Sequence, residues 1–316
     1  MQPRMKCPVY KEILVPESSE EDKENDTIAF GWLTCPVIDH MSVLAITVLD
    51  IILMESDASL LKRELLNSGL CKQAYSYFDS EVAELPYVIV LKGCKGQDVE
   101  TLFSLCQHLF KKIISQGIQL REIESALHQL ELSRSEITGN GTPYGLSLIL
   151  RSGLPYLHGA RAETSLMIHS LFEELRNKII EHPTYFPELI EKYFVDNTHC
   201  VKMLAIPTQT VIEEENKQER EGLSIIQNSL TDEQKNELVL AAEHLERFQN
   251  TEDDDKLIEL LPKILLSDIP KKAKHFSLNV DHIKNVDVYH HSTFTNNILY
   301  LDLVFPLPMI AHEDLW

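Results

Sequence analysis

The order of strand-like and helix-like segments is the feature that most constrains how this chain can fold. Between residues 27 and 208, the apolar pattern predicts one strand, two helices, two strands, a group of helices and a final strand. The strands are expected at 27–38, 71–80, 85–95 and 200–208. Strands in local pairs and helices in groups favour an α+β fold, in which helices pack on a mostly antiparallel sheet.

The predicted helices differ in how much of their surface is apolar. Residues 40–54 are apolar nearly all round, which is typical of a buried helix. The next helix should begin near Ser56 or Asp57, either of which can cap it, and should end at Gly69. A helix over 98–117 opens with an Asp cap and closes with a Gly, and further helices are expected at 119–137, 142–159, 164–180 and 183–197.

Changes in composition divide the chain into four predicted parts. Residues 1–26 are polar and acidic, contain Pro3, Pro8 and Pro16, and are expected to be a linker. Residues 27–210 form the α+β domain, and residues 211–270 form a charged helical hairpin. Residues 271–316 contain two strand-like stretches and are interpreted as the opening strands of a following domain that is cut off.

The charged hairpin is a natural arm or hinge between domains. Gly222 and the stretch 229–234 are expected to break it into two helices. Cap candidates for the second helix are Ser229, Thr231 and Asp232. In the final part, the strand-like stretches are 275–294 and 296–307.

The charge balance excludes some classes of partner. With 29 Lys and Arg against 49 Asp and Glu, the net charge is −20. Binding a phosphate backbone needs clustered basic residues, so nucleic acid is not an expected partner. The acidic surface could steer basic peptides toward the chain, although a merely solvated surface is the simpler interpretation. Much of the charge lies in three runs, Glu17 to Asp26, Glu213 to Glu221 and Glu252 to Asp255, which are typical of solvated faces or loops.

Compartment signals point to a cytosol-like setting. No run of 18 or more apolar residues could span a membrane, and no apolar segment near the N-terminus resembles a signal peptide. Six scattered cysteines, Cys7, Cys35, Cys71, Cys94, Cys106 and Cys200, have no paired spacing and are interpreted as reduced thiols.

Residues 128–132, HQLEL, come closest to a catalytic motif. In the inverted zinc peptidase motif H-x-x-E-H, two His residues bind the metal and the Glu acts as general base. Here His128 and Glu131 are present, but Leu132 occupies the position of the second His. Leucine has no lone pair for a metal, and a catalytic zinc needs three protein ligands. We therefore predict an ordinary amphipathic helix here rather than a damaged zinc site.

The remaining histidines form no predicted metal site. His290 and His291 are adjacent, so in a strand they point to opposite faces. Together with His275 and His282, they are interpreted as a chance surface cluster.

Residues between the last helix and the last strand of the α+β domain are also interpreted as structural. Asn197, which follows Asp196, is a C-cap candidate because asparagine tolerates the left-handed conformation. His199 could act as an acid or base, but the sequence shows no partner for it. Ser59, Asp281 and the cysteines form no recognisable triad. The sequence thus predicts no catalytic, metal-binding or cofactor-binding residue.

Six motifs occur in order along the chain: SDASLLKRELLNSGL, LPYVIVLKGCKGQDVETLF, ALHQLELSRSE, YFVDNTHCVKMLAIP, LSDIP and HHSTFTNNILYLDLVF. In this order they resemble the presequence-protease group of the pitrilysin and insulinase-like zinc metallopeptidases, from about residue 27 to the end. Ala58-Ser59-Leu60 stands where the family usually has S-P-L. Thr198 replaces the Pro of N-P-H, and Asn297 replaces the Gly of T-N-G-I.

The resemblance implies a place in a larger enzyme of four homologous domains, whose two halves close around a chamber. This chain would cover the second domain, the linker hairpin and the start of the third. The zinc and its H-x-x-E-H motif belong to the first domain, and a substrate-binding Arg and Tyr belong to the last. No catalytic residue therefore carries over, zinc is expected only in the parent enzyme, and the likeness of HQLEL to a zinc motif is a coincidence.

Two functions follow as alternatives. The first is a non-catalytic segment of a zinc metalloendopeptidase that degrades peptides, forming the chamber wall and the hinge and inactive alone. Its partners would be the missing catalytic and C-terminal domains and unfolded peptides, with no nucleic acid and no membrane. The second is a stand-alone scaffold that binds peptides or a partner subunit without hydrolysis, using an exposed strand edge. The expected location is the cytoplasm, or an organelle matrix if the parent carries a transit peptide upstream.

Overall fold

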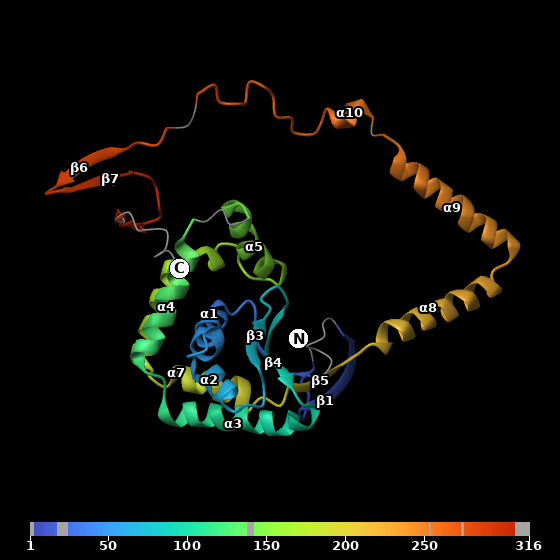
Figure 1. Cartoon of the computed structure of the whole chain (residues 1–316), viewed down its shortest axis with the longest axis horizontal. Coiled ribbons are helices and arrows are strands. Elements are labelled where there is room, and N and C mark those ends of the chain that lie inside the picture. Colours follow the sequence, from blue (N-terminus) through green and yellow to red (C-terminus); the bar gives the residue numbers. More distant parts are fainter. Residues whose placement is uncertain (1–2, 18–24, 138–141, 253, 273–274, 307–316) are drawn as a thin grey trace, which may run out of the picture. The chain divides into compact units, whose positions relative to one another are not determined.

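A five-stranded sheet organises the larger part of the chain (Figure 1). A computed structural model describes residues 3–17, 25–137, 142–252, 254–272 and 275–306. The strands are β1 Val9–Pro16, β2 Asp26–Pro36, β3 Gln73–Phe78, β4 Glu84–Cys94 and β5 Cys200–Thr208, in the spatial order β1-β5-β2-β4-β3. β1 runs parallel to β5, whereas the other neighbouring pairs are antiparallel. The predicted α+β class, with a mostly antiparallel sheet, is confirmed.

The helices of this part lie between β2 and β3 and between β4 and β5. They are α1 His40–Asp50, α2 Leu60–Asn67, α3 Val99–Gln116, α4 Leu120–Ser135, α5 Tyr144–Leu157, α6 Ile168–Glu181 and α7 Tyr185–Ile190. A π-helical turn, Ile51–Glu55, extends α1, and another, Glu191–Val195, extends α7. Short 3₁₀ turns, Gly96–Asp98 and Thr164–Leu166, precede α3 and α6.

Helix ends follow the predicted signals in part. Gly69 and Gly117 have φ angles of 70° and 73°, the left-handed region that glycine enters most easily, and each follows a helix end as predicted. The N-cap of α2 is Ser59, not Ser56 or Asp57. Its hydroxyl donates to the Ile51 carbonyl oxygen (3.2 Å) and accepts from the Ser56 backbone N–H (3.0 Å). The serine thus ties α2 back to the turn before it.

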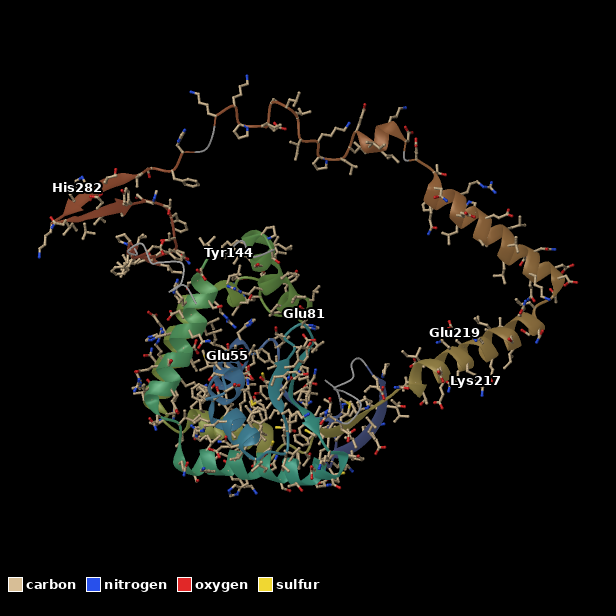
Figure 2. The ribbon with its side chains drawn as sticks, viewed as in Figure 1. Glu55, Glu81, Tyr144, Lys217, Glu219 and His282 are labelled. Atoms are coloured by element: carbon tan, nitrogen blue, oxygen red, sulfur yellow. The ribbon has the colours of Figure 1, made fainter. Side chains whose placement is uncertain are left out.

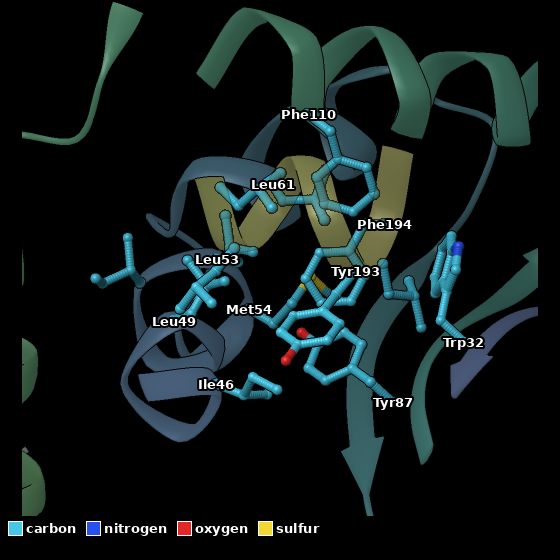
Figure 3. Packing of buried hydrophobic residues seen from close by; sticks show 14 of the residues in the cluster. Trp32, Ile46, Leu49, Leu53, Met54, Leu61, Tyr87, Phe110, Tyr193 and Phe194 are labelled. Atoms are coloured by element: carbon cyan, nitrogen blue, oxygen red, sulfur yellow. The ribbon is translucent and has the colours of Figure 1, made fainter. Parts of the chain in front are cut away.

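Aromatic residues fill the core between the sheet and its helices (Figure 3). The Phe194 ring lies 5.5 Å from Trp32, 5.2 Å from Phe110 and 5.0 Å from Tyr87, measured between ring centroids. These rings come from β2, α3, β4 and the π turn that follows α7, so the cluster joins distant parts of the sequence. Every second residue of β2 and β4 points into this core, which is the period expected of strands with one buried face.

The N-terminal segment differs from its prediction. Residues 1–26 were expected to be a linker, but Val9–Pro16 forms an edge strand, with Val9 opposite Val201 and Ile13 opposite Ala205. Most side chains of this strand are exposed, so its sequence lacks the alternation by which a half-buried strand is recognised. Residues 18–24, in the first acidic run, lie outside the described part.

Contacts divide the chain into two units. One holds the described parts of Met1–Val211 and Thr295–Trp316, and the other holds Ile212–Phe294. In the second unit, α8 Thr210–Ser229 and α9 Asp232–Asn250 contain no buried residue, and Lys217 and Glu219 project from α8 (Figure 2). The acidic run of residues 213–221 is exposed, as predicted, whereas residue 253 of the third run lies outside the described part.

The break between α8 and α9 falls at Leu230 and Thr231. Thr231 caps α9 reciprocally with Gln234: each side-chain oxygen accepts from the other residue's backbone N–H, at 3.3 Å and 3.0 Å. The prediction that Gly222 also breaks the helix is wrong, because α8 passes through it unbroken. A glycine costs a helix interior only about 1 kcal/mol, which its neighbours in a long helix can offset.

The last described residues keep part of the predicted strand structure. β6 Asn279–Ile283 and β7 Val286–His290 pair in antiparallel register, after the short helix α10 Asp255–Ile258. The second predicted stretch, 296–307, shows no strand over its described residues, 296–306. An extended segment becomes a strand only when another strand takes its backbone hydrogen bonds, and none is paired with it there.

A tight turn begins this final segment. Asn296 and Asn297 have positive φ angles of 54° and 65°, and the Ile298 N–H donates to the Thr295 carbonyl oxygen (3.2 Å). This is the mirror-image turn that suits a β-hairpin. The Asn296 amide also donates to the carbonyl oxygen of Ser135, the last residue of α4 (2.9 Å). The segment is therefore fastened to the first unit at its start.

Candidate functional site

The HQLEL stretch lies on α4, where its glutamate serves a structural contact. The Glu131 carboxylate accepts a hydrogen bond from the Arg176 guanidinium of α6, and His169 Nδ1 lies 3.9 Å from its other oxygen. The bond from Arg176 lowers the pKa of Glu131, which is the opposite of what a general base working near neutral pH requires. Leu132 is 54% exposed beside the exposed His128, and its side chain has no atom that could bind a metal.

A metal site would need further ligands nearby. Among residues 3–17, 25–137, 142–252, 254–272 and 275–306, no group of three or more His, Cys, Asp or Glu side chains is arranged to hold a metal ion. HQLEL supplies only His128 and Glu131, and Glu131 is occupied by Arg176. The absence of zinc from this chain stays a prediction that metal analysis must test.

The four histidines near the C-terminus, His275, His282, His290 and His291, do not share one cluster. His282 Nδ1 lies 2.6 Å from an Asp287 carboxylate oxygen near the β6–β7 turn, while His290 is opposite Asn279 at the other end of the hairpin. His291 Nδ1 contacts the Ser277 carbonyl oxygen (3.2 Å), and His275 is exposed. Two of the four rings thus already have hydrogen-bond partners of their own.

The segment 196–199 fastens the sheet to the helices. The Asn197 amide donates to the carbonyl oxygens of Leu33 (2.9 Å) and Tyr193 (3.1 Å), and its side-chain oxygen accepts from the His199 N–H (3.0 Å). The expectation of a left-handed C-cap at Asn197 is wrong, because Asn197 is not among the residues with positive φ. Its side chain, rather than its backbone conformation, satisfies the Tyr193 carbonyl oxygen of the π turn.

His199 has a partner that the sequence did not reveal. Its Nδ1 accepts a hydrogen bond from the Met5 backbone N–H (3.0 Å), and the Thr198 hydroxyl donates to the Met5 carbonyl oxygen (2.8 Å). The His199 side chain is buried, at 7% exposure. This contact with the N-terminal segment fits a structural role, and among the described residues no carboxylate is hydrogen-bonded to the ring to orient it for acid–base chemistry.

A hollow lies on the sheet face that points away from the aromatic core. It measures about 280 Å³ and is lined by Ala29, Gly31, Trp32, Leu33, Pro86, Val88, His199, Val201 and Met203. Almost all of these belong to β2, β4 and β5, and none of the described helices contributes a residue to it. Gly31 faces Val88 and Val201 across the neighbouring strands, so its missing side chain leaves the floor of the hollow open.

This hollow is the candidate site that sequence reasoning missed. The sequence pattern that could have indicated the hollow lies in β2, where the small residues Ala29 and Gly31 alternate with the large core residues Phe30 and Trp32. Small residues between bulky ones leave a strand face shallow. Nothing in the sequence alone showed that β4 and β5 would flank β2 and complete the lining.

A second groove, of about 390 Å³, lies between the π turn after α1 and α4. Its lining is more polar and includes Arg121, Glu122 and Gln129, whose amide donates to a Glu55 carboxylate oxygen (3.3 Å). Ser59 lines it as well, but the Ser59 hydroxyl is already bound to the Ile51 carbonyl oxygen. The hydroxyl proton of Ser59 therefore goes to a backbone carbonyl oxygen rather than to a general base that would make the serine a nucleophile.

The cysteines are free thiols of two kinds. Cys7 is exposed, and the other five, Cys35, Cys71, Cys94, Cys106 and Cys200, are buried. Burial raises the pKa of Cys35 to about 11 and those of Cys94 and Cys200 to about 12. A thiol is nucleophilic as the thiolate, so these buried thiols are inert at neutral pH. Among the described residues, no helix is both long enough and apolar enough to span a membrane.

Comparison with protein families gives two matches that together cover most of the chain. Residues 5–130 match the family described as "Peptidase M16 inactive domain", and residues 206–315 match a family of segments associated with subfamily C of the same M16 peptidases. The first match covers β1 through most of α4, including the β2 and β4 parts of the hollow. This part of the chain is therefore a non-catalytic peptidase-like domain.

Two relatives match nearly the whole chain. Presequence protease 1, chloroplastic/mitochondrial, of Arabidopsis thaliana is 28% identical over 295 residues, which cover 92% of this chain and 27% of the relative. The mitochondrial presequence protease of Drosophila melanogaster is 26% identical over 303 residues, which cover 93% of this chain and 28% of the relative. The chain spans less than a third of the length of either protein.

Among solved structures, a protease from Helicobacter pylori aligns with a TM-score of 0.49 and 16% identity, over 65% of this chain and 45% of that one. The assignment rests on the sequence matches, which agree with the order of motifs along the chain. The chain belongs to the presequence-protease group of the pitrilysin-like M16 peptidases.

Proposed function

We propose that this chain is a non-catalytic part of a zinc metalloendopeptidase that degrades peptides, and that the hollowed sheet face forms part of the wall of its substrate chamber. The observation that carries the proposal is the apolar hollow on β2, β4 and β5, which no described helix lines, in a domain of the inactive peptidase type. An apolar sheet face left without a covering helix favours contact with another molecule or domain. An unfolded peptide offers apolar side chains that fit such a hollow.

Charge supports the same choice of substrate. The chain carries a net charge of −20, so its field attracts basic peptides over distances longer than any contact. A wall that is negative overall and apolar at the hollow would hold a basic, unfolded peptide. Such binding would not require a particular peptide sequence. Selection by these two properties suits an enzyme that takes many unfolded peptides.

The helices α8 and α9 supply the proposed hinge. They are long, charged and without buried residues, and only Leu230 and Thr231 separate them. Such helices can lead from one domain to the next without packing into either. The packing of α8 against α9 as a hairpin is part of the proposal.

The rest of the enzyme would come from other domains. We propose that catalytic and C-terminal domains are the partners of this chain and that the catalytic zinc is bound by the former. The names of the relatives place those proteins in mitochondria and chloroplasts. For this chain, an organelle matrix or the cytoplasm is the proposed location.

The first experiment measures zinc content and peptidase activity on the same purified chain. We expect no stoichiometric zinc and no cleavage of a fluorogenic, unfolded basic peptide, with or without added zinc. Cleavage that EDTA abolishes, together with one zinc per chain, would overturn the assignment of this chain as non-catalytic.

A second experiment tests the hollow directly. Binding of an uncleavable, dye-labelled basic peptide is measured by anisotropy for the wild type, for Met203→Gln in the hollow and for Leu223→Gln on the exposed surface of α8. Loss of one apolar contact, about 1–1.5 kcal/mol, should weaken binding roughly tenfold for Met203→Gln. The Leu223→Gln control should bind like the wild type. Equal affinity for all three proteins would remove the hollow from the proposal.

A further inference from the structure

One imidazole belongs to the lining of the apolar hollow. The Leu33 N–H donates to the carbonyl oxygen of His199 (3.3 Å), so residue 199 continues the pairing of β5 with β2. Side chains two residues apart in an extended strand share a face, which places His199 on the same face as Val201 and Met203. All three residues line the hollow. The buried ring of His199 therefore lies on the hollow side of the sheet.

The contact with the N-terminal segment determines which ring nitrogen of His199 carries hydrogen. A backbone N–H can only donate, so the bond from the Met5 N–H (3.0 Å) makes Nδ1 the acceptor. In a neutral imidazole the other nitrogen, Nε2, then carries the hydrogen. Among the described residues, Nε2 has no hydrogen-bond partner. The ring thus offers an unused N–H donor beside an apolar surface.

Trp32 also lines the hollow, but its indole lies on the other side of the sheet. The Nε1 atom is buried and has no hydrogen-bond partner among the described residues. The ring packs against Phe194 in the aromatic core, because Trp32 alternates with the hollow-facing residues Gly31 and Leu33 along β2. His199 is therefore the donor that a molecule in the hollow can reach.

The rest of the lining indicates which acceptor fits this donor. Among the described residues that line the hollow, none is Asp, Glu, Lys or Arg. A carboxylate would lose hydration there without meeting a positive charge, whereas a neutral carbonyl oxygen loses less and gains a hydrogen bond. The net charge of −20 disfavours an anion as well.

We propose that a main-chain carbonyl oxygen of a bound peptide accepts a hydrogen bond from His199 Nε2, while a neighbouring large apolar side chain of the peptide fills the hollow. This inference rests on the proposed chamber wall and adds the residue that holds the peptide backbone. Every peptide has main-chain carbonyl groups, so the bond positions a peptide without selecting its sequence.

The first test observes the ring by nuclear magnetic resonance in the full chain with ¹⁵N-labelled histidine. The His199 signals are those lost in His199→Phe and kept in His182→Phe, which alters an exposed histidine. If His199→Phe does not fold, His199→Gln gives the same assignment. In the wild type we expect hydrogen on Nε2 of His199. Hydrogen on Nδ1 would overturn the proposal.

Titrations with small probes then test the ligand. N-acetyl-leucine N-methylamide, which has neutral carbonyl groups and an apolar side chain, should shift the Nε2 signal of His199. N-acetylglycine N-methylamide lacks the side chain and should shift it much less, as should N-acetyl-leucine with a free carboxylate. A larger shift with the free acid would overturn the choice of a neutral carbonyl. No shift with any of the three probes would overturn the site.

Peptide affinity separates this inference from the proposed function. With the dye-labelled basic peptide, His199→Phe should bind about fivefold more weakly than the wild type, because one hydrogen bond is lost. His199→Gln keeps a donor and an acceptor and should recover part of the affinity, and His182→Phe should bind like the wild type. If Met203→Gln weakens binding but His199→Phe does not, this inference fails and the chamber wall stands. If neither variant weakens binding, both fail.

Discussion

At the scale of single residues, two carboxylates in the first unit respond to their surroundings in opposite ways. Asp50, at the end of α1, accepts a hydrogen bond from the Tyr87 hydroxyl (2.7 Å), yet burial raises its pKa above the ordinary value. Glu131 has a lowered pKa because Arg176 binds its charged form. Glu131 therefore contributes stability above about pH 4.3, its unfolded pKa, and that contribution is lost as the pH falls through the lower folded pKa.

Asp50→Asn should stabilise the chain at neutral pH. The raised folded pKa means that the folded state holds the Asp50 proton more tightly than the unfolded chain does. The stability of the protonated form is fully present below about pH 3.9 and is lost as the pH rises through the folded pKa. Asparagine mimics that form, so we expect the free energy of unfolding to rise at pH 7 and to stay unchanged below pH 4. Urea unfolding at both pH values measures it, and a loss of stability at pH 7 would contradict the sign.

Leu132→His would create the H-x-x-E-H pattern at residues 128–132, but we do not expect it to create a zinc peptidase. The variant places His residues at 128 and 132 around Glu131, but a catalytic zinc needs a third protein ligand, and Glu131 is held by Arg176. We expect less than one zinc per chain after dialysis against a weak chelator, and no peptidase activity. Tightly held zinc in this variant, absent from a matched Leu132→Gln control, would show that a hidden third ligand exists.

At the scale of helices and strands, local sequence signals predicted most elements, and distant pairing decided the exceptions. The apolar stretch 40–54 became α1 and its π turn, and glycines ended α2 and α3 where they were expected. β1 was missed because its partner, β5, lies nearly two hundred residues away and most of its side chains stay exposed. The predicted strand over 296–307 failed for the converse reason: its alternation is clear, but no strand pairs with its described residues.

The capping box of α9 gives a prediction confined to one element. Thr231→Ala removes the side-chain oxygen that accepts the Gln234 N–H, which should cost the helix about 1 kcal/mol. Because α9 has no buried residue, packing cannot compensate. Hydrogen exchange should accelerate about fivefold for the first turn of α9 and stay unchanged in α3. A Thr231→Ser control keeps the oxygen and should exchange like the wild type, and equal rates in all three proteins would contradict the role of the cap.

At the scale of the whole molecule, the sequence predicted the class of fold better than the location of a candidate site. Grouped strands and helices were enough to predict α+β, because the arrangement of elements limits how layers can pack. The hollow needed β4 and β5 on either side of β2, and local sequence patterns do not show which strands will be neighbours in the sheet. The predicted domain limits at 26, 210 and 270 stay predictions, although the contact division after Val211 falls close to one of them.

Separate units should unfold separately. Phe194→Ala removes the ring at the centre of the aromatic cluster and should destabilise the first unit by about 3–5 kcal/mol. The helices α8 and α9 share no buried contact with that cluster and should keep their helical signal. Circular dichroism at 222 nm should then show an earlier transition for the sheet-containing unit and an unchanged component from the second unit. One cooperative transition that shifts as a whole would contradict this independence.

The distribution of the cysteines gives the folded chain a single reactive label site. Cys7 is exposed, whereas five thiols are enclosed by the first unit and do not ionise at neutral pH. A maleimide dye should therefore attach rapidly once per folded molecule, beside β1, and further additions should appear only as fast as the unit opens. Mass spectrometry of the labelled protein over time would count these additions, and two or more rapid ones would contradict the burial. The stepwise gain in mass would then report opening of the core in the wild-type sequence, without an added cysteine.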